Sequence, residues 1–140
     1  MSHASLIRRG AVALGLAGIA IVHILDLPSK WAETRYLAWG YIAIIAASLY
    51  LMERIIVRAE RIDYFASAGL AASVIAGFVV NRTVGMPGAM DDIGNWLEPL
   101  GMISLFVEAF VVWQSVRAIS DFTSENVARI AKNTRDLVNA

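Results

Sequence analysis

The stretch GAVALGLAGIAIVHILDL, residues 10–27, decides the fold of this chain. It is almost wholly apolar, and it approaches the roughly 20 residues that a helix needs to cross the roughly 30 Å of a lipid hydrocarbon core. Backbone groups in lipid must be hydrogen-bonded within their own segment, so we predict a transmembrane helix. Arg8 and Arg9 precede it, as in a secretory signal peptide. The exit ILDLPSKWAE, residues 24–33, lacks a small-residue cleavage motif, which favours a retained span.

Three further apolar segments follow, at about residues 36–57, 62–80 and 97–117. The chain of 140 residues is 58% hydrophobic and only 17% charged, whereas soluble domains are usually nearer half apolar and a quarter charged. The alternative is a soluble bundle, but its buried helices would be shorter and would keep a polar stripe, which the first three segments lack. We therefore predict an all-α fold, an integral membrane four-helix bundle over residues 1–118.

Composition also bears on the partners and the chemistry. The 12 basic and 12 acidic residues balance to a net charge of zero, which gives no sign of a nucleic-acid partner. The chain contains no cysteine, so disulfides, thiol chemistry and cysteine-ligated metals are excluded. The lipid bilayer is the first partner that the composition predicts.

The basic residues predict how the four spans are oriented. Nine of the 12 lie at the N-terminus, around the connection between the second and third spans, and in the C-terminal tail. Basic residues are enriched in cytoplasmic segments, so we predict a multi-pass protein with both termini in the cytoplasm. The connections after the first and third spans then lie outside. Trp31, Trp39 and Trp96 would lie near the outer interface and Trp113 near the inner one, where indole rings prefer to lie.

Residues 119–140 change character and predict a short cytoplasmic helix separate from the bundle. Ser124 suits an N-cap, with Glu125 in the first turn. Apolar residues recur there at helical spacing, so we expect an amphipathic helix that lies on lipid headgroups, pairs with a partner helix, or stays in water. The positions are Val127, Ile130, Ala131, Thr134, Leu137 and Val138.

A polar layer is predicted at the outer end of the bundle. His23 and Asp26 are three residues apart, so they share one face of the first span. The connection NRTVGMPGAMDDIGNWLEPLG, residues 81–101, is rich in turn residues and brings more charged side chains to the same level. These are Arg82, Asp91, Asp92 and Glu98.

Two interpretations of this layer stay open. In the first, His23, Asp26 and Glu98 bind a divalent metal or gate protons, since imidazole with carboxylates suits zinc, manganese or iron. In the second, Arg82 pairs with Asp26 or Glu98 and His23 bonds a carbonyl, because buried charges are normally paired. Local structure already explains part of the acidity: Glu98 precedes Pro99 at the predicted start of the fourth helix, where the helix dipole stabilises an anion.

Glu108 is the most unusual residue of the fourth span. It lies ~16 Å along the helix from Leu97, which places it near the bilayer midplane. An acid there costs at least ~2.5 kcal/mol, so Glu108 should face the bundle, and such a residue is a functional candidate by default. The structural alternative is a protonated Glu108 that hydrogen-bonds across helices. Partners at similar depth are Ser48, Ser73, Tyr41 and, one turn earlier, Ser104.

The sequence HILD at residues 23–26, together with NRTVGMPG and DDIGNWLEPLG in the third connection, resembles a set of small four-span bacterial membrane proteins of the actinobacterial type. The resemblance covers most of residues 10–115 and leaves out the tail. It implies the four-span fold and a bacterial cell (inner) membrane, and it supplies no activity. The matched residues are His23, Asp26, Arg82, Thr83, Gly85, Pro87, Gly88, Glu98, Pro99, Leu100, Gly101 and Glu108.

The sequence leaves three classes of function open. The first is a non-catalytic accessory or scaffold subunit of a homo-oligomer or larger membrane complex, because four spans leave little room for a transport path. The alternative is a metal-binding or proton-coupled protein that uses the outer polar layer and Glu108, with a divalent metal as its cofactor. The third is an enzyme of the outer face with Asp91, Asp92 or Glu98 as acid or base, for which no partner constellation is visible.

Overall fold

The computed structural model describes residues 3–138, with side chains described over residues 5–137. It contains α1 (His3–Glu33), α2 (Arg35–Val57), α3 (Arg61–Thr83), the short 3-10 helix η1 (Met90–Asp92) and α4 (Pro99–Val138), and no strand within that range. The predicted all-α fold with four long helices is confirmed. Each of the four is long and apolar enough to cross a membrane, by length and composition.

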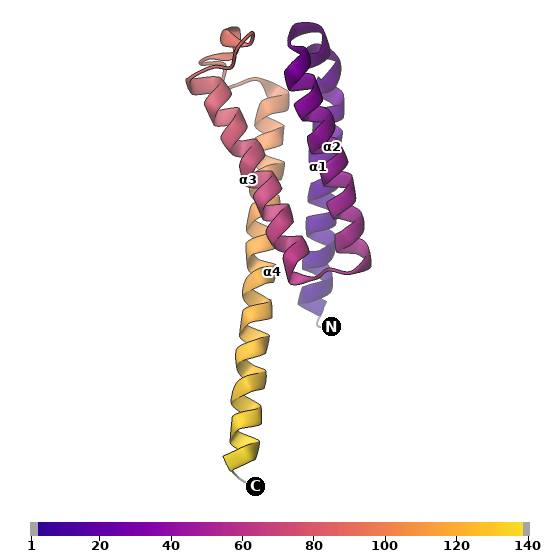
Figure 1. The fold of residues 1–140 in the computed structure, drawn as a ribbon, viewed down its shortest axis with the longest axis vertical. Coiled ribbons are helices and arrows are strands. Elements are labelled where there is room, and N and C mark those ends of the chain that lie inside the picture. Colours follow the sequence, from indigo (N-terminus) through magenta and orange to yellow (C-terminus); the bar gives the residue numbers. More distant parts are fainter. Residues whose placement is uncertain (1–2, 139–140) are drawn as a thin grey trace.

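The four helices lie side by side, with both termini at the same end (Figure 1). We call this the tail end, because α4 continues well past the other helices there. The opposite end carries the α1–α2 turn and the connection of residues 84–98, and we call it the loop end. Figure 1 shows α2 and α3 close together at the short turn that joins them and diverging towards the loop end.

The first helix is longer than the predicted span. Pro28 lies inside α1, which continues to Glu33 although proline removes one backbone hydrogen bond. Contacts with the loop hold this last turn in place. Thr34, at the α1–α2 turn, donates to the carbonyl of Gly88 at 2.9 Å, and Lys30 lies 3.5 Å from an oxygen of Asp92.

The predicted separate tail helix is wrong. α4 runs without interruption from Pro99 to Val138, and Ser124 lies inside it, where its hydroxyl donates to the carbonyl of Ser120 at 3.1 Å. The helix continues because residues 102–138 contain neither glycine nor proline to break it. Residues 139–140 of the predicted tail, and the side chain of Val138, lie outside the described parts of the chain.

The core forms where α1 meets α4 at close range. Val12, Leu16 and Ile19 of α1 are fully buried, as is Val111 of α4. A methyl group added at Gly15 would lie 2.5 Å from the side chain of Val111. Glycine is therefore required for the two helices to approach this closely, as small residues do in bundles.

A tight turn of residues 58–60 joins α2 to α3 and is fixed by polar contacts. Asp63 accepts from the backbone N–H of Glu60 at 2.9 Å and from Arg54 at 2.8 Å. Glu60 and Asp63 form a reciprocal capping box, which satisfies backbone donors at the start of α3. Ala59 adopts a positive φ of 55°, a backbone conformation that residues other than glycine rarely take.

Large apolar side chains lie exposed along all four helices. A soluble monomer rarely exposes so much contiguous apolar surface, so this surface needs a nonpolar environment or a partner. Examples are Leu14 (74% exposed), Tyr50 (60%), Ile62 (61%), Phe106 (71%) and Trp113 (59%).

Candidate functional site: a polar cavity at the loop end

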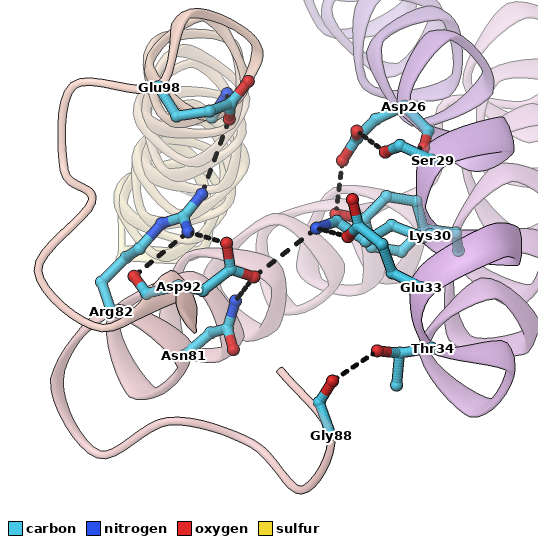
Figure 2. A network of polar contacts seen from close by, with 12 residues as sticks. Asp26, Ser29, Lys30, Glu33, Thr34, Asn81, Arg82, Gly88, Asp92 and Glu98 are labelled. Carbon is cyan, nitrogen blue, oxygen red and sulfur yellow. Dashed lines mark hydrogen bonds and ion pairs between the residues drawn. The ribbon is translucent and has the colours of Figure 1, made fainter. Parts of the chain in front are cut away.

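A network of ion pairs and hydrogen bonds converges on Asp92 at the loop end (Figure 2). Arg82 Nη1 lies 2.5 Å from Asp92 Oδ1 and also donates to the Asp92 carbonyl at 3.2 Å. Asn81 donates to Asp92 Oδ2 at 2.8 Å, and the ammonium of Lys30 lies 3.5 Å from the same oxygen. Asp92 belongs to η1, so one carboxylate joins the connection to α1 and α3.

These partners keep Asp92 ionised. Burial acts to raise the pKa of this carboxyl, but the hydrogen bonds from Asn81 and Arg82 and the charges of Lys30 and Arg82 outweigh burial and lower the pKa below its usual range. The neighbouring Asp91 is exposed, and none of the contacts described above involves it. The polar layer predicted from the sequence therefore uses the second aspartate of the pair.

Glu98 has two functions in the network, and the first is structural. Its carboxylate accepts from the backbone N–H groups of Leu100 at 3.0 Å and Gly101 at 2.7 Å. It thus caps the N-terminus of α4, where an anion is favoured by the helix dipole, as predicted. Its second contact is with Arg82 Nη2 at 3.6 Å, which confirms one of the two pairings expected for that arginine.

Asp26 is not a partner of Arg82. Its Oδ2 accepts from the hydroxyl of Tyr41 at 2.9 Å, and its Oδ1 accepts from Ser29 at 2.7 Å. The predicted alternative pairing of Arg82 with Asp26 is therefore wrong. Tyr41 on α2 reaches α1 here, and the sequence had placed it instead among the partners of Glu108.

His23 is buried on α1, one turn before Asp26. Its Nδ1 donates to the carbonyl of Ile19 at 2.9 Å, which is the carbonyl contact predicted for it. The ring meets Tyr41 edge-on, with centroids 4.8 Å apart. Nε2 has no hydrogen-bond partner among residues 3–138, so in the neutral ring it is a free acceptor.

These side chains border a cavity of about 210 Å³ between the four helices. α1, α2, α3, α4 and the connection all contribute to its wall. Buried polar atoms normally have a partner, yet Asn81 Oδ1 and Arg82 Nε have none within residues 3–138. Both residues line the cavity, and these two atoms are themselves buried, so each is an unmet hydrogen-bonding group within its wall.

Ser104 extends the cavity wall towards the middle of α4. It lines the cavity, and its hydroxyl donates to Glu108 Oε1 at 2.5 Å. Glu108 is fully buried, as predicted, and its Oε2 has no partner in the described part of the chain. Of the predicted partners, only Ser104 is confirmed: Tyr41 donates to Asp26, and Ser73 donates to the carbonyl of Leu70. Ser48 is buried with its hydroxyl oxygen unpartnered among residues 3–138.

The geometry gives the metal interpretation no support. His23, Asp26 and Glu98 all line the cavity. Within residues 3–138, however, no group of three or more histidine or acidic side chains is placed to hold a metal ion. Asp26 is committed to Tyr41 and Ser29, and Glu98 to the start of α4. The arrangement agrees with the second interpretation, in which the charged side chains pair with one another. It also leaves two polar atoms, Asn81 Oδ1 and Arg82 Nε, without a partner among residues 3–138.

No protein-family model, no curated protein and no solved structure matches this chain. The arguments about function therefore depend on the geometry of the cavity and of Glu108.

Proposed function

We propose that this chain is a multi-pass membrane protein that takes up protons at Glu108 through the polar cavity at the loop end. The observation that carries the proposal is the position of Ser104. This residue lines the cavity and donates to the buried carboxyl of Glu108 at 2.5 Å. A proton can therefore pass between the cavity and Glu108 through one hydroxyl group.

The membrane location supports this function. Four long apolar helices with exposed apolar side chains are suited to a lipid environment, and closed helices satisfy their own backbone groups there. Nine of the 12 basic residues lie towards the tail end, so we place that end and both termini in the cytoplasm. The cavity then faces the outside. The resemblance to small four-span proteins adds a bacterial cell membrane to this proposal.

Glu108 is chemically suited to bind and release a proton. An ionised carboxylate within a span is costly, and no cation pairs with Glu108 in the described structure. Taking up a proton removes this cost, and Ser104 can donate to the ionised acid or accept from the protonated one. A proton relayed by Ser104 arrives at Glu108 Oε1, the oxygen that the hydroxyl contacts, while Oε2 has no partner among residues 3–138.

The wall of the cavity supplies polar groups along the approach. Asn81, Arg82 and His23 are among the polar residues that line it, and a polar wall around a space of about 210 Å³ is suited to hold water. Arg82 is itself held by Asp92 and Glu98, which keeps its charge from repelling protons unopposed. The layer thus functions as a hydrated entry to Glu108 in our proposal.

Infrared spectroscopy of the protein in lipid nanodiscs tests this directly. A protonated carboxyl has a C=O stretching band that disappears on ionisation, so a titration should show one band that belongs to Glu108. We expect Glu108→Gln to remove that band and Ser104→Ala to shift its frequency. Glu53→Gln is the matched control, because Glu53 is exposed near the tail end of α2. A titrating band that persists unchanged in Glu108→Gln would contradict the proposal.

A second candidate function, an accessory or scaffold subunit, is favoured by a separate observation. α4 extends past the tail end with exposed apolar residues at helical spacing, namely Val127 (61%), Ile130 (64%) and Leu137 (79%). Such a stripe is suited to a partner helix, in a homo-oligomer or a larger membrane complex.

Molecular mass in mild detergent tests this second function. Ile130→Asp should break any association that depends on the stripe. Ala128→Asp adds the same charge on another side of the helix and should not. A full-length protein that is monomeric and purifies alone would count against the scaffold function.

A further inference from the structure

The tail end carries a second cavity, of about 390 Å³, which the proposed function does not use. α1, the turn of residues 58–60, α3 and α4 form its wall. Its volume falls in the usual range of small-ligand sites. Three arginines line it, Arg8, Arg9 and Arg58, together with the acids Asp121 and Glu125.

The arginines differ in how fully they are engaged. Arg8 pairs with Asp121 and donates to the carbonyl of Arg117 at 3.4 Å. Arg9 uses Nε and Nη2 to bond the carbonyls of Ile55 and Ile56, so its Nη1 is left over. The contacts of Arg9 satisfy carbonyls at the C-terminus of α2, where a cation is favoured.

Arg58 is the uncommitted cation of this cavity. Its guanidinium forms no hydrogen bond or ion pair within residues 3–138. Asp121 is paired with Arg8. The wall then contains two further arginines, Arg9 and Arg58, and only one further acid, Glu125, so the cavity retains a positive charge. Guanidinium groups bind phosphate oxygens in a planar, two-pronged way, so the charge is of the type that phosphate recognition uses.

The position of the cavity indicates where the phosphate comes from. Ile7 directly precedes Arg8 and is 71% exposed. Val57 directly precedes Arg58 and is 66% exposed. Tyr64 and Phe122, with ring centroids 5.9 Å apart, provide aromatic surface in the wall. Arginines next to exposed apolar side chains match the boundary between lipid headgroups and acyl chains, and the cytoplasmic leaflet is the negatively charged one.

We propose that this cavity binds the phosphate group of an anionic phospholipid, with Arg58 and Arg9 as its ligands. The proposal depends on the membrane orientation given above, but not on proton uptake by Glu108. The lipid would join the N-terminal part of α1 to the α2–α3 turn and to α4, where the long helix leaves the bundle (Figure 1). Its acyl chains would lie along Ile7 and Val57.

The test uses the full-length protein in detergent, titrated with short-chain phosphatidylglycerol, with phosphatidylcholine of the same chain length, and with inorganic phosphate. Native mass spectrometry counts the bound molecules. We expect phosphatidylglycerol to bind at least tenfold more tightly than phosphatidylcholine. Arg58→Gln should weaken its binding about tenfold, the scale of one charge-assisted hydrogen bond. Arg35→Gln, the same charge change at the loop end, should leave binding unchanged.

Other outcomes decide against the assignment. Equal binding of both lipids, unchanged by Arg58→Gln, would overturn the proposal. Binding of inorganic phosphate that needs Arg58, without any preference for phosphatidylglycerol, would overturn the lipid assignment and give the site to a soluble phosphate. Arg9→Gln also removes contacts at the end of α2, so Arg58→Gln, which breaks no contact in the described structure, is the variant that decides.

Discussion

The guanidinium of Arg82 lies 2.5 Å from the carboxylate of Asp92, although the two residues belong to different elements, the end of α3 and the 3-10 helix of the connection. Arg82 is only 5% exposed, so this contact is largely shielded from solvent. The same arginine reaches Glu98 at the start of α4. One side chain thus ties the end of α3 to the middle of the connection of residues 84–98 and to its last residue, and it holds the wall of the cavity in place.

Replacing Arg82 should therefore destabilise the loop end. Arg82→Gln removes the arginine that pairs with Asp92 and Glu98, and loss of one member of a buried ion pair costs about 3 kcal/mol or more. Because Asp92 is partly exposed, we expect the lower end of that range. Thermal unfolding in detergent measures the loss. Arg35→Gln, an exposed arginine at the same end, should change the midpoint little, and an equal effect in both variants would contradict this role of Arg82.

The stability of the loop end should also depend on pH through Asp92. Its pKa is lowered in the folded protein from the usual 3.8, so the ionised form stabilises the fold. This contribution is fully present above the unfolded pKa and is lost as the pH falls towards the folded pKa. We expect wild type to lose unfolding free energy below about pH 4. Asp92→Asn should lose less over the same interval, and parallel curves for the two proteins would refute the linkage.

Two helix glycines should respond in opposite directions to alanine. A methyl group at Gly101 would lie 2.6 Å from the ring of Phe78 and 2.8 Å from Glu98 Oε2, so Gly101→Ala should cost about 1–3 kcal/mol. At Gly69, on the exposed side of α3, nothing lies within 4 Å. Gly69→Ala should stabilise its helix by about 0.5–1 kcal/mol. Unfolding midpoints measure both changes, and stabilisation by Gly101→Ala would show that packing at Gly101 is not limiting.

Ala59→Gly should stabilise the turn between α2 and α3. Ala59 has a φ of 55°, which costs a residue with a side chain roughly 1–2 kcal/mol and costs glycine little. We expect an increase of about 1 kcal/mol in unfolding free energy, measured by thermal or denaturant unfolding. Ala66→Gly, at an exposed position in the second turn of α3, is the control and should destabilise by about 1 kcal/mol. If Ala59→Gly gave no gain in unfolding free energy, the positive φ of Ala59 would not be a source of strain in the turn.

Hydrophobic length made the number and the approximate positions of the helices predictable. Segments that lack polar residues over some 20 positions have few other ways to satisfy their backbone. The predicted starts near Tyr36 and Ile62 fall within one residue of α2 and α3. The end of α1 was harder to predict. Pro28 usually signals the end of a helix, but contacts with the loop hold α1 helical beyond it.

Which polar side chains meet could be predicted only in part. The sequence placed Arg82, Glu98 and one loop aspartate at a single level, and these three do converge. It could not choose between Asp91 and Asp92, because that choice depends on the conformation of a turn-rich connection. Nor could it pair Tyr41 with Asp26, since the pairing depends on how α1 and α2 are rotated about their axes.

The continuity of α4 has a mechanical consequence. Glu108 and Leu137 belong to one stiff rod that lacks any glycine or proline hinge between them, about 44 Å apart at 1.5 Å per residue. A push, pull or twist applied to the projecting part is transmitted along the rod to the hydroxyl–carboxyl pair inside the bundle. In the proposed orientation, a cytosolic partner that displaces the projecting part of α4 would change the surroundings of Glu108, and with them its protonation.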